Sequence, residues 1–287
     1  MAENKTRLWF QFQTPADEIE REIRQHAEQV EYLRFDCDDF FTPQRLKGIE
    51  LPRLRDLAMS PLHPLKVDFV LDWLNGLPSL IRLDSFCVKA SDSMFTQIAK
   101  SSWWPRLTYF GAKFRDLKSS DAWTSLWQSR PLALQILCLQ YLDTPQAQAV
   151  ITGDFPDLRW LILGYEIRDE FLQTIASAKL PKLTDLELRF TNVSPDGFRA
   201  FVKMPHPGLP NLQRIGWKCS SDRREDYCDW NGAVVDWSYE WMTDNELRKE
   251  FFKGTNLTLA PLDHTLSQKM DYSQAQYAFG RFLEHLQ

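Results

Sequence analysis

The chain has no long apolar run: about 18 consecutive uncharged apolar residues are needed to span a membrane, and none of its 287 residues belong to such a stretch. We therefore expect no transmembrane helix. The first residues lead directly into a short alternating segment, without the apolar stretch and small-residue cleavage site of a secretory signal. Cysteine is scarce, with five residues scattered singly. Such an odd, sparse set predicts reduced thiols in a cytoplasmic protein.

Motifs that carry catalytic chemistry are also missing. The chain has only 11 glycines and contains no G-x-G-x-x-G, G-x-x-x-x-G-K-[ST] or G-x-S-x-G motif. Cys219 and Cys228 lie too far apart for the tight cysteine pair of a zinc site. Cys138 has apolar neighbours, which predict a raised thiol pKa and a poor nucleophile. We expect a protein that is not an enzyme and that uses no metal or cofactor.

Basic charge is not in surplus, because 34 Lys and Arg face 39 Asp and Glu and the net charge is −5. A general nucleic-acid binder needs a clustered basic surface, so we do not expect nucleic acid as a partner. The acidic balance favours a basic protein partner through electrostatic steering. Apolar residues make up 44% of the chain and aromatics 13%, which is enough to form a large core.

The chain does contain a repeated segment. The heptapeptide LPRLRDL at 51–57 has close relatives in LPSLIRL at 77–83, FPDLRWL at 155–161 and LPKLTDL at 180–186. The first leucine of each L-x-x-L-x-Φ core (Φ, apolar) recurs after 24 to 29 residues, at Leu54, Leu80, Leu107, Leu134, Leu158, Leu183 and Leu212. A weaker copy covers 30–35. This period and core resemble the leucine-rich-repeat family over roughly residues 30–217. A regular Asn or Cys after each core is missing, and only Asn192 lies near that place.

The spacing of apolar residues predicts the shape of each repeat. Each core reads as a short strand with leucines on one side. Helical spacing follows at 67–74, 171–178 and 194–202. Units this short stack as a parallel array, so we expect an α/β leucine-rich-repeat solenoid, ribonuclease-inhibitor-like but irregular, with strands on the concave side and helices on the convex side.

Both ends of the chain are predicted to be caps. Residues 1–29 read as a strand at 8–12 and a helix from Thr14 to about Gln29, and residues 30–217 hold about eight repeats. Residues 218–287 read as a C-terminal capping region, with a strand at 235–241, a helix from Thr243 to Gly254 and another helix at 272–286.

Strand alternation predicts which side chains lie on the concave face. The middle of that face is apolar or aromatic, with Tyr141 and Tyr165 just beyond it, and both flanks are charged. This composition is typical of a protein-binding hot spot, although the C-terminal cap or a second copy of the chain could also cover it. Asp185 and Glu187 could form an acid pair, but two nearby arginines favour an ion-pair network. The candidate residues are Phe86, Tyr109, Ile136, Trp160 and Ile162, flanked by Arg82, Asp84, Asp185, Glu187, Arg189 and Arg214.

The family resemblance implies a recognition module that docks its partner on the concave face. We expect a protein-binding protein that sequesters or inhibits one partner, for example a toxin-neutralising immunity protein, with no membrane association. One alternative is an adaptor or effector that recruits a target to other machinery such as a ubiquitin ligase. The other is an enzyme with a site in 218–287, involving Asp222, Cys228 or His264.

Overall fold

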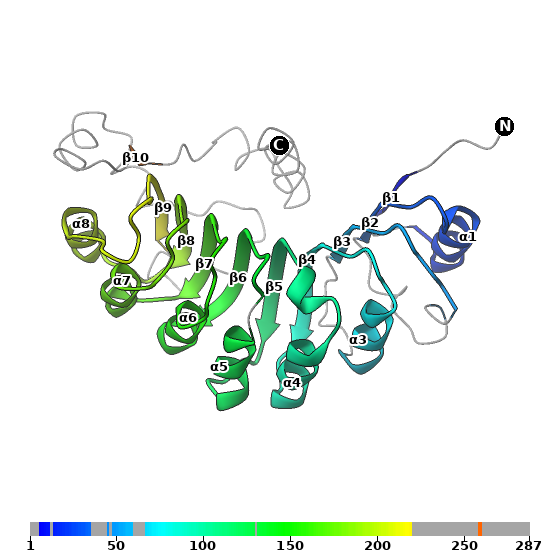
Figure 1. Cartoon of the computed structure of the whole chain (residues 1–287), viewed down its shortest axis with the longest axis horizontal. Helices are drawn as coiled ribbons and strands as arrows, with labels where there is room; N and C mark the ends of the chain where they lie inside the picture. The colour runs from blue at the N-terminus through cyan, green and yellow to red at the C-terminus, as the bar shows by residue number, and fades with distance from the viewer. Residues whose placement is uncertain are drawn as a thin grey trace.

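The computed structural model describes residues 6–11, 14–35, 45, 48–59, 67–129, 131–219 and 258–259. These residues form one sheet of ten strands in sequence order, from β1 to β10. All of its neighbouring strands are parallel. Figure 1 shows the sheet bending into an arch, with the helices along its outer side. The protein is therefore of the α/β class, with an open sheet that is compatible with an α/β solenoid.

Strands and helices alternate from β3 to β9, as the repeat predicted. The strands are β1 (Arg7–Phe10), β2 (Tyr32–Phe35), β3 (Asp56–Met59), β4 (Arg82–Lys89), β5 (Tyr109–Arg115), β6 (Ile136–Asp143), β7 (Trp160–Glu166), β8 (Asp185–Thr191), β9 (Arg214–Cys219) and β10 (Thr258–Leu259). The helices are α1 (Ala16–His26), α3 (Val67–Asn75), α4 (Asp92–Lys100), α5 (Asp121–Gln128), α6 (Thr144–Ile151), α7 (Asp169–Ala176) and α8 (Pro195–Lys203), with a 3-10 turn at Trp104–Arg106. The three helices expected from spacing correspond to α3, α7 and α8.

The repeat cores pair in register, because the same position of each core is aligned from strand to strand. The aligned side chains, named at the end of this paragraph, are each at most 1% exposed. They therefore form one continuous buried row under the sheet. Their alignment confirms the strand positions inferred from the L-x-x-L-x-Φ pattern. The row consists of Leu33, Leu57, Leu83, Phe110, Leu137, Leu161, Leu186 and Ile215.

A tight turn brings each chain segment into the sheet. In the repeat at 180–186, the N–H of Leu183 donates to the carbonyl of Leu180 at 3.1 Å, and the same bond joins Leu54 to Leu51. Proline often stands second in this turn, where its fixed φ suits the turn and its missing N–H is not needed. The first leucine of each core is therefore buried at the start of a strand.

One backbone carbonyl then links each repeat to the next. The N–H groups of Arg159 and Trp160 both donate to the carbonyl of Gln135, at 2.8 and 3.1 Å. The same forked bond recurs at every junction from β1 to β9. Because these groups belong to the backbone, the link does not depend on which side chains a repeat carries. The accepting carbonyls are those of Thr6, Glu31, Arg55, Ile81, Thr108, Gln135, Arg159 and Thr184.

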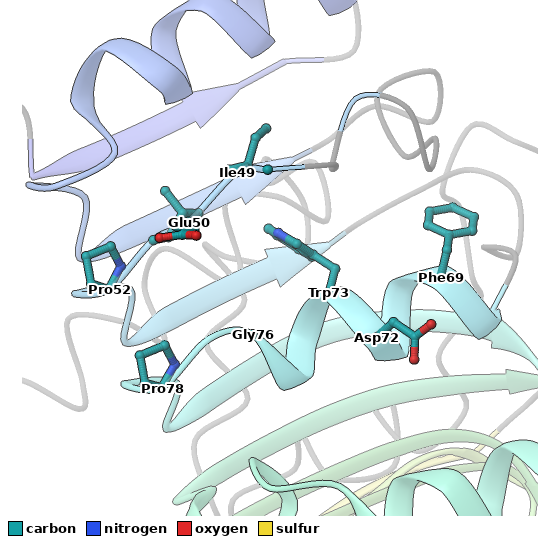
Figure 2. Close-up of a pocket in the computed structure, with 10 residues that line it drawn as sticks. Ile49, Glu50, Pro52, Phe69, Asp72, Trp73, Gly76 and Pro78 are labelled. Atoms are coloured by element: carbon teal, nitrogen blue, oxygen red, sulfur yellow. The ribbon is translucent and has the colours of Figure 1, made fainter.

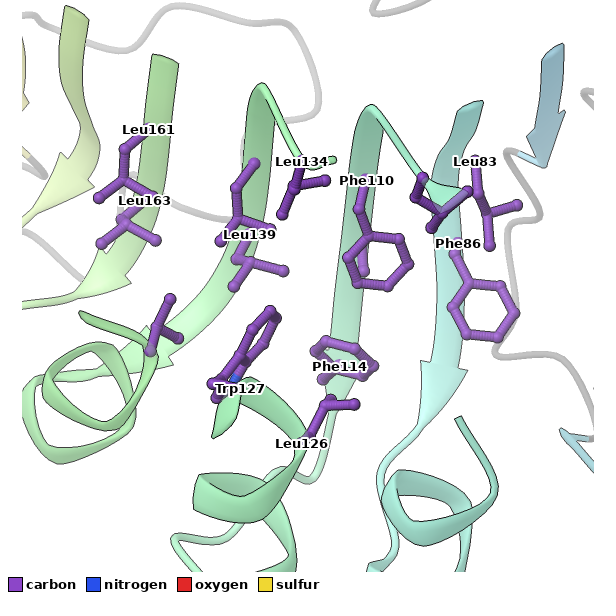
Figure 3. Close-up of a cluster of buried hydrophobic side chains, with 14 of the residues drawn as sticks. Leu83, Phe86, Phe110, Phe114, Leu126, Trp127, Leu134, Leu139, Leu161 and Leu163 are labelled. Atoms are coloured by element: carbon purple, nitrogen blue, oxygen red, sulfur yellow. The ribbon is translucent and has the colours of Figure 1, made fainter. Parts of the chain in front are cut away.

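The middle of the core is aromatic. Phe114, Trp123 and Trp127 contact one another or their neighbours edge to face, with centroids 5.4 Å apart for Phe114–Trp123 and 5.0 Å apart for Trp123–Trp127. Figure 3 shows Phe114 and Trp127 lying between the strands and the helices. The indole N–H of Trp123 donates to the carbonyl of Gln146 at 3.1 Å, which satisfies a polar group inside this apolar layer.

Side-chain hydrogen bonds link the starts of neighbouring helices. The carboxylate of Asp169 accepts hydrogen bonds from the backbone N–H of Ser194 at 2.7 Å and from its hydroxyl at 2.6 Å. Ser194 in turn caps α8, and Ser120, which caps α5, donates to Asp92 at 2.7 Å. These bonds join the beginning of one helix to the next, although the linking residues differ from repeat to repeat.

The structure describes only part of the two terminal regions. Strand β1 begins near the predicted position, and α1 follows Thr14-Pro15 but ends three residues before Gln29. In the C-terminal region, β10 pairs in parallel with β9. The elements expected at 235–241, 243–254 and 272–286 lie outside the described residues. Within the described part of the chain, no helix has the length and apolar character needed to cross a membrane.

Replacing a leucine of the buried row should destabilise the fold. Leu161→Ala removes a side chain that is 0% exposed, so we expect a loss of about 2–5 kcal/mol in the free energy of unfolding. Urea denaturation followed by circular dichroism measures this loss. The matched control is Leu132→Ala, because Leu132 is 48% exposed and should change stability by no more than about 0.5 kcal/mol. Equal effects of the two variants would contradict the placement of the row.

Candidate functional site

The inner face of the sheet, opposite the helices, carries two rows of side chains that alternate with the buried row. The parallel register aligns the first row across nine strands and the second across two groups of strands. None of these residues belongs to the hydrophobic core cluster. The first row is Arg7, Tyr32, Asp56, Arg82, Tyr109, Ile136, Trp160, Asp185 and Arg214, and the second is Trp9, Arg34, Ala58 and Asp84, then Gly111, Cys138, Ile162, Glu187 and Gly216.

Phe86 was expected on this face, and that expectation is wrong. The pairing of β4 with β5 shifts by one residue between Leu83 and Phe86, so that Phe86 is aligned with Ala112, a core position. Ser85 has a φ of 54°, which produces the bulge and turns the next side chain over. Phe86 is 0% exposed, and Figure 3 shows its ring beside Phe110 in the core, with centroids 6.4 Å apart.

The aromatic and aliphatic residues of the two rows lie on the inner face but do not form the open apolar patch that was expected. Tyr109 and Ile136 are 6% exposed and Ile162 is 2% exposed, whereas Trp160 is only partly buried. Strands lie about 4.8 Å apart, and inward-pointing side chains converge on the inner side of a curved sheet. Neighbouring residues of one row therefore pack sideways on one another.

Tyr109 in β5 is held by polar contacts with the neighbouring strand β4. Its hydroxyl donates to Asp84 Oδ1 at 2.9 Å, and the guanidinium of Arg82 lies 5.2 Å from its ring centroid. Gly111 leaves the necessary space, because a Cβ there would lie 2.4 Å from Asp84 Oδ1. Burial raises the pKa of the Asp84 carboxyl, although the hydrogen bonds from Tyr109 and from the N–H of Ser85 oppose this effect.

The charged residues of β8 and β9 are paired with one another. Arg189 donates to both oxygens of Glu187, at 2.7 and 3.0 Å, and Arg214 forms an ion pair with Asp185. These contacts confirm the ion-pair network over the alternative of an acid pair. Charge on this flank of the inner face is therefore largely balanced, so the net acidity of the chain must be carried elsewhere.

The chemistry expected of Cys138 also agrees with the structure. Burial raises the pKa of its thiol to about 12, so the group stays protonated and is a poor nucleophile at neutral pH. Among the described residues, no group of three His, Cys, Asp or Glu side chains is placed to hold a metal ion. The enzymatic site considered for 218–287, with Asp222, Cys228 and His264, lies outside the described residues.

The two tyrosines that the sequence placed just beyond the candidate residues form an aromatic pair towards the ends of β6 and β7. The rings of Tyr141 in β6 and Tyr165 in β7 lie 5.3 Å apart, and the guanidinium of Arg115 lies 4.8 Å from the Tyr141 ring centroid. Tyr165 is 36% exposed. We call Arg115, Tyr141 and Tyr165 the tyrosine ladder.

The tyrosine ladder depends on unusual backbone. Tyr141 has a φ of 64° and Tyr165 a φ of 108°, values that residues with a bulky side chain seldom adopt. Each stands four residues after an aligned core leucine, Leu137 or Leu161, where strict alternation would point it into the core. The positive φ turns each tyrosine out of the core. The signal in the sequence is the shared offset of the two tyrosines in neighbouring repeats.

No protein-family model matches the chain, and no curated protein matches it. The proposal for its function therefore rests on the contacts described above.

The buried Asp84 should make stability depend on pH. Its pKa is raised in the folded state, so folding is penalised as the pH rises above the ordinary value of the carboxyl and Asp84 must ionise. Asp84→Asn removes this penalty while keeping an oxygen that accepts from Tyr109. The free energy of unfolding of the variant should therefore rise relative to wild type between pH of about 4 and about 7, as measured by urea denaturation. A difference that does not change with pH would contradict the assignment.

Proposed function

We propose that this protein is a leucine-rich-repeat solenoid that binds another protein through the inner face of its sheet and the adjoining tyrosine ladder. Two observations support the fold part of the proposal: the 24- to 29-residue period of the L-x-x-L-x-Φ core, and the in-register parallel sheet with helices outside. A curved parallel array of this kind presents a long concave surface to a partner.

The tyrosine ladder carries the functional part of the proposal. A non-glycine residue in the left-handed region costs about 1–2 kcal/mol, and two neighbouring repeats bear this cost at Tyr141 and Tyr165. The result is a pair of tyrosine rings in tilted contact, one exposed and one partly exposed, with an arginine beside it. Strained backbone persists where function requires it, and Tyr and Arg are the residue types enriched in binding hot spots.

The inner face next to the tyrosine ladder suits a rigid docking surface. Trp160 lies in the first row and is partly exposed, with Ile136 beside it on β6 and Asp185 on β8. The ion pairs of β8 and β9 form a polar rim on one side, as interfaces usually have. Because these side chains already contact one another, a partner would dock on a surface that is ordered before binding. Sequestration or inhibition of the partner is the mode that we favour.

Substitutions in the tyrosine ladder and the first row should weaken partner binding. The full chain serves as bait to purify its partner from cells that produce it, and the purified pair is then titrated by calorimetry. Tyr165→Ala and Trp160→Ala should each raise the Kd about 30-fold, which corresponds to about 2 kcal/mol, while leaving the fold intact.

The same Leu132→Ala variant is the control, since it removes a large exposed side chain without touching the inner face. If Tyr165→Ala and Trp160→Ala bind as tightly as Leu132→Ala, the proposed docking surface is wrong. Recovery of further copies of this chain would instead indicate self-association. Recovery of a ubiquitin ligase core would favour the adaptor alternative.

A further inference from the structure

A pocket of about 550 Å³ opens on the outer side of the arch, between helix α3 and the segment that leads into β3. It is separate from the inner face, because α3 covers the other side of the sheet. Figure 2 shows the indole of Trp73 reaching from α3 towards that segment. The residues that matter for its chemistry are Ile49, Glu50, Pro52, Phe69, Asp72 and Trp73.

Two carboxylates, those of Glu50 and Asp72, border this pocket. Within the described residues, neither Glu50 nor Asp72 takes part in a side-chain hydrogen bond or an ion pair, and no Lys or Arg lines the pocket. Asp72 also borders a smaller hollow that contains Lys100, but no ion pair joins these two residues. On the inner face, by contrast, Asp185 and Glu187 are neutralised by arginines. The outer pocket therefore presents local negative charge at Glu50 and Asp72.

Trp73 forms the aromatic wall between the two carboxylates. Its side chain is 9% exposed, and its Nε1–H has no hydrogen-bond acceptor within the described part of the chain. Phe69 lies beside it on the same helix, one turn earlier. An aromatic face next to unpaired carboxylates attracts a cation through both the ring quadrupole and the negative charge.

We propose that this outer pocket binds the arginine side chain of a basic peptide segment. A guanidinium is planar, so it can stack on the indole of Trp73 while it is attracted by Glu50 or Asp72. A free metal ion has no planar face to stack on the indole, and a neutral ligand would not neutralise the carboxylates.

The indole N–H of Trp73 gives a direct readout for this site in the full-length protein. The ¹⁵N–¹H correlation peak of Trp73 is assigned by its loss in Trp73→Phe. Titration with Nα-acetyl-arginine amide should shift the peak, whereas Nα-acetyl-citrulline amide, which has nearly the same shape but no charge, should not. Glu50→Gln and Asp72→Asn should each raise the fitted Kd about three- to fivefold.

Glu170→Gln is the matched control, because Glu170 is an exposed carboxylate on α7, away from the pocket, and its loss should leave the Kd unchanged. Three results would overturn the proposal. They are an equal shift with the citrulline compound, unchanged affinity in both Glu50→Gln and Asp72→Asn, or tighter binding of Nα-acetyl-lysine amide than of the arginine compound.

Discussion

Every junction between repeats, from β1 to β9, is made by one backbone carbonyl that accepts two successive N–H groups of the next repeat. This forked bond and the tight turn before it determine where each strand starts, and the strand start determines which side chains face inward. Because the bond uses only backbone atoms, repeats of 24 to 29 residues with different outer segments can join the same sheet. The buried row, the inner rows and the helices all follow from it.

Curvature then changes what alternation alone would produce. Side chains that point inward from a bent sheet approach one another, and this explains why Ile136 and Ile162 are nearly inaccessible although neither belongs to the core. Bulges change which face of the sheet a side chain lies on. At Ser85 a bulge moves Phe86 from the inner face into the core, whereas a bulge at Tyr141 and a positive φ at Tyr165 turn aromatic rings out of it. The proposed binding surface is thus built as much by departures from regular strand geometry as by the repeat itself.

The two proposed binding surfaces differ in their electrostatics. On the inner face, arginines pair with Glu187 and Asp185, so recognition there depends on shape and aromatic contact. On the outer side, Glu50 and Asp72 have no such partners among the described residues, and both border the pocket that Trp73 lines. A partner with both an ordered surface and a basic segment could contact the protein at two places.

The amino-acid order by itself determined the strand starts, the buried row and the α/β class, because a local turn and a period of two are written in adjacent residues such as those at 180–186. It also predicted the pairing of Asp185 and Glu187 with arginines. Only the tertiary structure decided the exposure of the inner side chains, since that depends on how far the sheet bends. The tertiary structure alone decided that Phe86 lies in the core and that Tyr141 and Tyr165 turn out of it. The reason is that a residue with positive φ reverses the side-chain directions that follow it in the strand. The outer pocket likewise joins Glu50 and Trp73, which are 23 positions apart and are brought together only by stacking.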